Sequence, residues 1–470
     1  MVFPLTITAL VTLGGGCWRR DLPTIDPGGD DGRGGVEGGR GGSYGASGGT
    51  SGPGGAYGGL PHGTGAGGGA AASANKLDVL FMVDDSASMA PLQTKLAAQL
   101  PNFLDGLKDP TTGQYRDLHV GVVSSSLGAG DWGNVNQCAS GVHPGDDAGK
   151  FQQGPGGAGS GNCTMLNMGE KFLKSGDGTA ANPQNFSGSI GPALQCMALL
   201  GDSGCGFESQ FKAVLTALAK AADPLDPDNG GFLRADARLL IVMLTNEDDC
   251  SVANDSLLLD PGINSAMDPS GLGALQSYRC NEFGHLCGGQ PPPHGFDLGM
   301  TPPEANLATG TYRTASGPGT GGVVLNGCVS EDGAGKTETL SFPFTNPAGV
   351  PDPTHGHLYG TIPAITAAIK SYKADPNDVF VAAVAGPTTD GAGQSLYRVF
   401  AQSNPAAGGE MDPVVDHSCV QATAADPEYA DPAVRIHQWV DGFGANGVFY
   451  PICANDFSAA LTAIASVATN

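Results

Sequence analysis

Five short, continuous apolar segments recur along the later part of this 470-residue chain. They are Leu77–Val83, Leu118–Ser124, Arg238–Thr245, Val379–Gly386 and Gly447–Cys453. Strands that are covered on both faces have such continuous apolar runs, whereas half-exposed strands alternate. Segments with helical periodicity lie among them, at Met89–Lys108, Phe207–Ala221, Ile362–Lys373 and Asp456–Ala468. The alternation predicts an α/β fold with an open, mostly parallel, doubly wound sheet and flanking helices.

Composition divides the chain into three parts. Residues 1–17 have the character of a signal peptide, residues 18–75 of a tether, and residues 76–470 contain the predicted sheet. About half of the positions from Pro27 to Ala70 are glycine, so the tether has little apolar surface to bury and is predicted to be disordered. Three long polar stretches, at about 127–186, 251–357 and 387–431, are predicted to be insertions stapled by disulfides.

The N-terminus carries a compartment signal. The apolar run "VFPLTITALVTL" is too short to span a bilayer as a mature helix, and small residues separate it from Cys17. This pattern resembles a bacterial lipoprotein signal, in which the cysteine is lipidated and becomes the mature N-terminus. An ordinary secretory signal is the alternative, because the pattern departs from a lipoprotein signal in two ways: no Lys or Arg precedes the apolar run, and the usual Leu lies one position too far from Cys17. We therefore predict an extracytoplasmic protein, in the periplasm or at the cell surface, that meets the membrane only through a lipid on Cys17.

The charge balance restricts the partners. The formal net charge is −24, from 46 acidic and 22 basic residues. This balance argues against nucleic acid and against an anionic membrane surface as a partner. It favours cation binding, although most of these carboxylates are expected to form a solvated acidic surface.

The cysteines also indicate export. Of 11 cysteines, Cys17 belongs to the signal, and the other ten lie in the predicted domain. None has the paired spacing of a zinc site, so we predict up to five disulfides formed in an oxidising compartment. The candidates are Cys138, Cys163, Cys196, Cys205, Cys250, Cys280, Cys287, Cys328, Cys419 and Cys453. We predict the pair Cys419–Cys453, which would tie an insertion to the last strand, and less firmly Cys196–Cys205.

Polar residues follow the first predicted strand. In "FMVDDSASM", Asp84, Ser86 and Ser88 occupy every second position, so their oxygens are expected to face one way, while Asp85 faces the other way and should tolerate Asn. Ligands of open parallel sheets bind beyond the carboxyl ends of the strands. Carboxylate and hydroxyl oxygens with water suit Mg²⁺, or Ca²⁺ if further carboxylates join. The stretch therefore predicts a divalent-cation site.

The same residues carry a family resemblance. "FMVDDSASM", "GCGFE", "TNEDDCS" and "ICANDFSAALTAIA" resemble the von Willebrand factor type A (VWA) domain with its metal-ion-dependent adhesion site, and more specifically Cys-rich lipoproteins of deltaproteobacteria such as myxobacteria. The resemblance covers Leu77 to the C-terminus and implies the ligands Asp84, Ser86 and Ser88.

Two further ligand positions depart from that family. The family's threonine has no counterpart, and Glu208 matches its place best, with Ser203 as a weaker candidate. The second family aspartate corresponds to Asn246, which supplies no charge; Glu247, Asp248 or Asp249 would compensate, and we include Asp248 in the expected set. A degenerate, metal-free site is the alternative, in which Asp84 merely caps the following helix.

The resemblance implies a binding module rather than an enzyme. A VWA-like domain would recognise a protein or cell-surface ligand through the cation, with an acidic group of the partner completing the coordination shell. No catalytic residue is assigned. Two alternatives stay open: a hydrolase of envelope polymers that uses carboxylates at the same edge, and a structural envelope protein with a vestigial metal site.

Overall fold

The computed structural model describes residues 73–132, 135, 138, 147–154, 163, 165–176, 183–253, 256–261, 275–293, 311–314, 317–320, 323–331, 358–404, 410–421 and 428–469. The chain divides into two compact units, Met1–Ala56 and Tyr57–Asn470, and every described residue belongs to the second unit. The predicted signal peptide with Cys17, and the tether as far as residue 72, lie outside the described residues.

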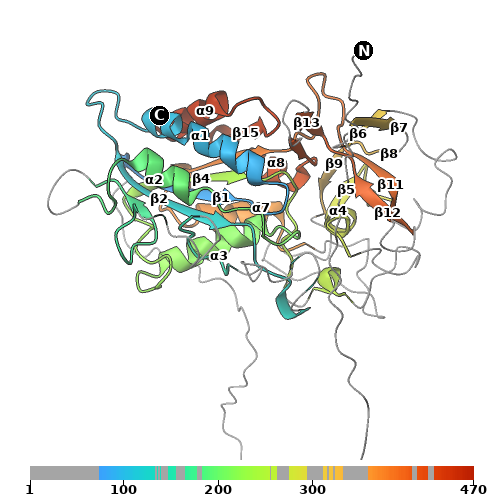
Figure 1. Cartoon of the computed structure of the whole chain (residues 1–470), viewed down its shortest axis with the longest axis horizontal. Coiled ribbons are helices and arrows are strands. Elements are labelled where there is room, and N and C mark those ends of the chain that lie inside the picture. The colour runs from blue at the N-terminus through green and yellow to red at the C-terminus, as the bar shows by residue number, and fades with distance from the viewer. Residues whose placement is uncertain are drawn as a thin grey trace, which may run out of the picture. The chain divides into compact units, whose positions relative to one another are not determined.

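A six-stranded sheet forms the centre of the described part of the chain, and it confirms the predicted fold class (Figure 1). In spatial order the strands are β15 (Gly447–Pro451), β10 (Val379–Ala385), β4 (Ala237–Leu244), β1 (Ser73–Val83), β2 (Asp117–Ser124) and β3 (Leu173–Lys174). All neighbours pair in parallel except β2 and β3, which are antiparallel. Each predicted strand is present, and β1 begins at Ser73, four residues before the predicted start.

The register aligns the carboxyl ends of the central strands. Val83 of β1 lies opposite Ser124 of β2 on one side and opposite Leu244 of β4 on the other. On the other side of β4, Leu244 lies opposite Val384 of β10. The chain order reverses at β1, because β2 lies on one side of it and β4 on the other. Such a reversal opens a crevice at the carboxyl ends of the strands, where doubly wound folds bind ligands.

Helices cover both faces of this sheet (Figure 1). The first face packs against α1 (Ala90–Gly106), α2 (Ile190–Met197) and α9 (Ser458–Thr469). The second face packs against α3 (Gln210–Ala222), α7 (Ile362–Lys370) and α8 (Val434–Asp441). The apolar periodicity predicts all of these helices except α2 and α8. Those two have 8 residues each, which is too short for a repeating pattern to stand out.

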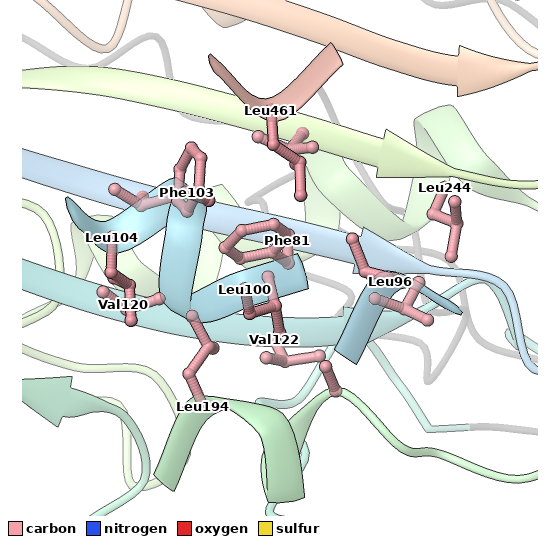
Figure 2. Packing of buried hydrophobic residues seen from close by; sticks show 14 of the residues in the cluster. Phe81, Leu96, Leu100, Phe103, Leu104, Val120, Val122, Leu194, Leu244 and Leu461 are labelled. Atoms are coloured by element: carbon pink, nitrogen blue, oxygen red, sulfur yellow. The ribbon is translucent and has the colours of Figure 1, made fainter. Parts of the chain in front are cut away.

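Aromatic and aliphatic side chains fill the space between β1 and the first helical layer. Phe81 of β1 is fully buried and meets Phe103 of α1 edge-on, with ring centroids 5.5 Å apart. Figure 2 shows Phe81 among Leu100 of α1, Val122 of β2 and Leu461 of α9. Full burial of one such side chain contributes about 1.5–3 kcal/mol. This packing fixes the direction in which β1 delivers Asp84 to the edge of the sheet.

Smaller elements belong mainly to the predicted insertions. The strands are β5 (His285–Cys287) with β9 (Cys328–Ser330), β6 (Thr311–Thr314) with β7 (Gly317–Thr320), β8 (Val323–Val324) with β11 (Arg398–Asn404) and β12 (Glu410–Val415), and β13 (Cys419–Gln421) with β14 (Glu428–Ala430). The helices are α4 (Tyr278–Gly284) and short 3-10 turns at Gly130–Trp132, Leu257–Leu259, Pro376–Asp378 and Gly444–Asn446. Among the described helices, none combines the length and apolar character needed to span a bilayer.

All ten cysteines of the domain are paired, as predicted. The disulfides are Cys138–Cys205, Cys163–Cys196, Cys250–Cys280, Cys287–Cys328 and Cys419–Cys453. The prediction of Cys419–Cys453 is confirmed. The prediction of Cys196–Cys205 is wrong, because α2 turns Cys196 toward the first insertion while the loop before α3 carries Cys205 to another part of it. Five disulfides are typical of proteins that fold outside the cytoplasm.

Candidate cation site

Asp84 lies at the carboxyl end of β1, fully buried. Its Oδ1 accepts hydrogen bonds from the backbone N–H of Ser86 at 2.8 Å and from the Ser125 hydroxyl at 3.2 Å. Its Oδ2 accepts from the Thr245 hydroxyl at 2.7 Å. Within the described residues these donors are neutral, and none is a Lys, Arg or His side chain. Asp84 is therefore oriented by three donors but not neutralised by any of them.

Asn246 follows β4 and joins the second serine of the motif. Its Nδ2 donates to the Ser88 hydroxyl at 2.8 Å and to the Tyr429 carbonyl at 3.2 Å. These bonds orient the amide and leave Oδ1 of Asn246 buried without a hydrogen-bond partner. The Ser86 hydroxyl is likewise buried without a partner. The sequence motif after β1 and the polar residue after β4 thus meet at the reversal of the strand order.

Glu208 is delivered to the same edge by the loop before α3. The backbone N–H of Ser209 donates to the Ser125 carbonyl at 2.9 Å, and the N–H of Cys250 donates to the Glu208 carbonyl at 2.8 Å. These bonds hold the loop between the ends of β2 and β4. The Glu208 side chain is 0% exposed; neither carboxylate oxygen accepts from an N–H or hydroxyl group of the described residues, and the Glu208 carboxyl hydrogen-bonds with the Glu247 carboxyl. Ser203, the weaker candidate from the same loop, is exposed to solvent.

Burial and like charge raise the pKa values of these carboxyl groups. Burial raises the pKa of Glu208 well above its usual range, and nearby Glu247 and Asp84 raise it further. Burial also raises the pKa of Asp84, although the hydrogen bond from Thr245 opposes the shift. The pKa of Glu247 rises to about 8, first through burial and then through Asp431 and Asp84. A group of buried carboxyls without cationic partners must either keep protons or take up a cation.

Asp85, which the alternation turns away from the other motif oxygens, lies in the interior of the protein. It is fully buried, and its Oδ1 accepts from the Ser126 hydroxyl at 2.9 Å. Its Oδ2 has no hydrogen-bond partner, and burial together with Asp147 and Asp84 raises its pKa to about 8. Asp85 is buried because the loop that follows β2 and the loop that carries Gly204 both pack against it.

Asp248 lies apart from these oxygens. Its Oδ2 accepts from His285 Nε2 at 2.9 Å and from the backbone N–H of Arg435 at 2.8 Å, and its Oδ1 accepts from the N–H of Ile436 at 3.2 Å. Burial is the largest influence on the pKa of Asp248 and would raise it, but the hydrogen bond and charge of His285, together with the backbone N–H groups of Arg435 and Asp249, lower the pKa overall. The carboxylate therefore caps the start of α8 and its oxygens already accept these hydrogen bonds, so we leave Asp248 out of the ligand set.

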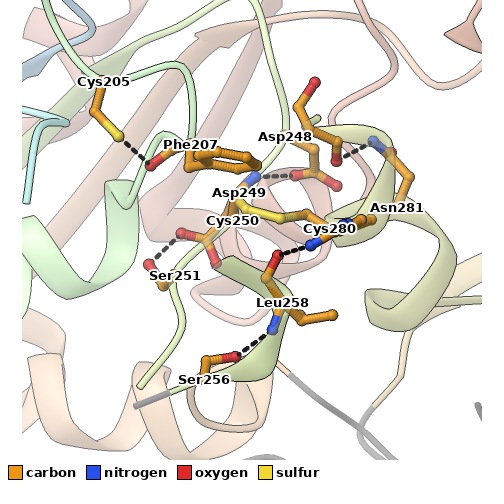
Figure 3. Close-up of a disulfide and its surroundings, with 12 residues drawn as sticks. Cys205, Phe207, Asp248, Asp249, Cys250, Ser251, Ser256, Leu258, Cys280 and Asn281 are labelled. Atoms are coloured by element: carbon orange, nitrogen blue, oxygen red, sulfur yellow. Dashed lines mark hydrogen bonds between the residues drawn. A yellow bond between two sulfur atoms is a disulfide. The ribbon is translucent and has the colours of Figure 1, made fainter. Parts of the chain in front are cut away.

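Asp249 has a structural role as well. Its carboxylate pairs with buried Arg435 at 3.3 Å and accepts from the Ser251 hydroxyl at 2.6 Å. Figure 3 shows this region beside the Cys250–Cys280 disulfide. The second disulfide near the edge, Cys138–Cys205, ends three residues before Glu208. Both loops that border the candidate site are thus fixed by covalent links to the insertions.

The oxygens at this edge suit a hard divalent cation. No group of three or more His, Cys, Asp or Glu side chains within the described residues is arranged to hold a metal. The available donors instead mix a carboxylate, hydroxyls and an amide oxygen, with Glu208 as a second carboxylate. Mg²⁺ uses few carboxylates and retains water, and Ca²⁺ accepts amide and carboxylate oxygens. The buried oxygens of Ser86, Glu208 and Asn246 accept no hydrogen bond from an N–H or hydroxyl group of the described residues, and they are the atoms that would coordinate such an ion.

Sequence reasoning missed the hydroxyl groups that orient Asp84. Ser125 and Thr245 each donate to its carboxylate, and Ser126 donates to Asp85. The sequence contains a signal for these groups, because three consecutive serines begin at Ser124, the last residue of β2, at the same edge of the sheet. Their contribution becomes visible only when the register places β2 beside β1.

Comparisons with known proteins add little to this geometry. No protein-family model matches the chain, and no curated protein matches it. Among solved structures, the chain has a distant match to the pilus adhesin SpaC from Lactobacillus rhamnosus GG, with 13% sequence identity and a TM-score of 0.24. The match covers 68% of this chain and 26% of the adhesin chain, so this chain spans about a quarter of the adhesin. A likeness at this TM-score carries no functional argument.

Proposed function

We propose that this protein is an extracytoplasmic, VWA-like binding module that holds one divalent cation, Mg²⁺ or Ca²⁺, at the carboxyl edge of β1 and β4. The observation that carries the proposal is Glu208, a fully buried carboxyl that hydrogen-bonds with the Glu247 carboxyl and has no cationic partner among the described residues, beside buried Asp84. Two carboxylates in this position are costly unless a cation neutralises them. The proposal needs no catalytic residue, and the partner is a protein or a cell-surface ligand.

Each residue has a distinct role in this proposal. Asp84 supplies the first charge, and its three hydrogen bonds hold it in one orientation. Ser86 and Ser88 supply neutral hydroxyl oxygens. Glu208 supplies the second charge and so compensates for Asn246, which contributes only an amide oxygen. When bound, the cation provides a positive centre that attracts an acidic group of the partner.

The location is part of the proposal. The five disulfides support an oxidising compartment. We extend this to lipidation of Cys17, with the Gly-rich tether between membrane and domain. Partition of the mature protein into the detergent phase, and loss of that partition in Cys17→Ser, is the expected result. An unmodified mature N-terminus in the aqueous phase contradicts the anchor but leaves the cation site intact.

Calorimetric titration tests the cation site. Mg²⁺, Mn²⁺ and Ca²⁺ are titrated separately into wild type, Asp84→Ala, Ser86→Ala and Glu208→Gln. We expect one ion per chain in wild type, no uptake by Asp84→Ala, and affinity lowered roughly 10–100-fold in Glu208→Gln and less in Ser86→Ala. Asp202→Asn is the matched control, because Asp202 is an exposed carboxylate in the same loop as Glu208.

Two outcomes contradict the proposal. If wild type takes up no divalent ion at millimolar concentration, Asp84 is only a cap and the site is degenerate. If the loaded protein releases soluble products from envelope polymers, the hydrolase alternative replaces the binding module.

A further inference from the structure

Most of the proposed ligand residues at the candidate cation site are buried. Asp84 and Glu208 are 0% exposed, Asn246 is 1% exposed and Ser86 is 4% exposed, whereas Ser88 is half-buried. A partner's acidic group would have to enter the coordination shell of an ion held here. The third predicted insertion contacts two of these residues, Ser88 and Asn246.

The contacting segment of this insertion is a strap made of residues 417–421 and 428–431, which includes β13, β14 and Asp431. The backbone N–H of Asp431 donates to the Asn246 carbonyl at 2.8 Å, and the Tyr429 carbonyl accepts from the Asn246 amide at 3.2 Å. The Tyr429 side chain also hydrogen-bonds to Ser88. The strap therefore contacts two proposed ligand residues directly, one after β1 and one after β4.

The strap is rigid around these contacts. His417 Nδ1 lies 2.6 Å from Asp431 Oδ1, and the His417 ring stacks on Tyr429 with centroids 4.1 Å apart. Both side chains belong to the strap, so its two strands are joined through side chains as well as through the ladder. The element would move as one piece rather than unravel at one residue.

Two clamps fasten the strap to the domain. The first is the disulfide from Cys419 in β13 to Cys453, just after β15. The second is Lys95 of α1, a nearly buried cation that pairs with Glu428 of β14. The Lys95 ammonium also donates to Gln421 Oε1 at 3.0 Å and to the Ala454 carbonyl at 2.9 Å. The two clamps lie next to each other, because the Lys95 ammonium also binds Ala454, the residue directly after Cys453.

We propose that this strap is a built-in cover of the cation edge, and that an external ligand reaches the bound ion only when the strap is released from Lys95 or from Cys453. This inference rests on the proposed cation site and describes how the access of an external ligand to the bound ion is regulated. The closed state described here holds the ion away from partners. Release of the strap exposes the ion without removing any of its proposed ligands.

The test uses Mn²⁺ as the bound ion and the full chain. Relaxation of water protons by bound Mn²⁺ reports whether solvent reaches the ion, and a chelator chase reports how fast the ion leaves. In Cys419→Ser/Cys453→Ser we expect higher relaxivity and release roughly tenfold faster or more, equivalent to about 1.4 kcal/mol in the opening equilibrium. Stoichiometry should stay unchanged, because no ligand is altered.

A matched control separates this effect from general loss of stability. Cys163→Ser/Cys196→Ser removes a disulfide of almost equal span, with a sequence separation of 33 residues against 34 for Cys419–Cys453. The two variants should lose similar stability, because loop length sets the entropy of the cross-link in the unfolded chain. Only the strap variant should change relaxivity and release.

A second variant tests the strap should the first fail to fold. Lys95→Met removes the buried clamp, and Lys76→Met removes an exposed ion pair with Asp236 at the opposite end of the sheet as its control. Faster release in Lys95→Met alone supports the cover. Equal relaxivity and release in wild type and both strap variants overturn it, while leaving Mn²⁺ binding intact. Absence of Mn²⁺ uptake in all variants overturns the cation site, and the cover with it.

Discussion

Two buried aspartates, one in the middle of β1 and one directly after it, have opposite surroundings. Asp78, which lies beside the amino-terminal ends of β2 and β4, is paired with Arg234 Nε at 2.8 Å and with Lys373 Nζ at 3.0 Å. Asp84, directly after the end, receives only hydroxyl and backbone N–H groups. Both side chains are 0% exposed. The fold therefore neutralises a buried carboxylate where it serves structure alone, and leaves one without a protein cation at the edge where doubly wound folds bind ligands.

The neighbours of the two aspartates strengthen this contrast. At the Asp78 end, Arg234 also pairs with Asp117 at 2.7 Å, so carboxylates and cations alternate. At the Asp84 end, Asp85 and Glu208 add further buried carboxylates, each with at least one oxygen that lacks a partner. Among the described residues, the buried carboxylates at the Asp78 end have cationic partners, whereas Asp84, Asp85 and Glu208 at the other end do not. Four measurements test that difference, beginning with the largest expected effect.

Removal of each aspartate charge in the presence of chelator compares the two ends directly. Asp78→Asn should lower the free energy of unfolding by about 3–5 kcal/mol, because Lys373 and Arg234 stay buried without their carboxylate. Asp84→Asn should change it by about 1 kcal/mol or less, since a lost hydrogen bond is offset by removal of an uncompensated charge. Urea denaturation followed by circular dichroism measures both. Equal losses in the two variants would mean that Asp84 has a charge partner after all.

Addition of a divalent ion should neutralise the buried carboxylates at the Asp84 end of the sheet and leave the Asp78 end unaffected. At a free Mg²⁺ or Ca²⁺ concentration 100 times the Kd, wild type should gain about 2.7 kcal/mol in the free energy of unfolding. Asp84→Ala should gain nothing. Asp78→Asn should leave this gain in the free energy of unfolding unchanged. Parallel urea curves with metal and with chelator give these values, and an equal gain in Asp84→Ala would place the ion elsewhere.

Acid should lower the stability of the protein at the Asp78 end of the sheet through protonation of His119. This side chain is 8% exposed, and burial, reinforced by Arg234, lowers its pKa to about 4. Because the unfolded-state pKa is about 6.5, the unfolded chain binds more protons between pH 6.5 and 4, and stability falls as pH falls through this window by about 2–3 kcal/mol. His119→Gln should lose this part of the pH dependence. Identical stability profiles of wild type and His119→Gln from pH 7 to 4 would contradict the assignment.

Asn246→Asp should have the smallest effect, and this effect should depend on whether metal is present. In chelator it should lower stability by about 1 kcal/mol, because Asp cannot donate to Ser88 or to the Tyr429 carbonyl and adds a like charge near Asp84. With metal, the added charge should tighten binding roughly fivefold and favour Ca²⁺, which accepts more carboxylates. Calorimetric titration against wild type measures the change. Weaker binding in the variant would show that the Asn246 donors matter more than charge.

Much of the fold was predictable because the apolar pattern is a local property. Each of the five long strands could be located from a continuous apolar run, although β15, at the edge of the sheet, is only partly buried. Asp84 could be placed at a strand end without any knowledge of its neighbours. The same local rules miss α8, where Arg435 and His437 interrupt a short apolar stripe. They also do not reveal that Asp85 is buried, because alternation along one strand contains no information about the loop packed over it.

The sequence by itself determined the α/β class, the oxygen-rich stretch after β1 and the even set of ten cysteines, since each follows from composition or spacing within a short segment. Only the tertiary structure decided which cysteines pair, that Asp248 caps α8 instead of joining Asp84, and that the strap covers the edge. These features depend on contacts between residues far apart in the chain. Asn246 and Tyr429, for example, are 183 positions apart and meet only because the sheet and the third insertion pack together.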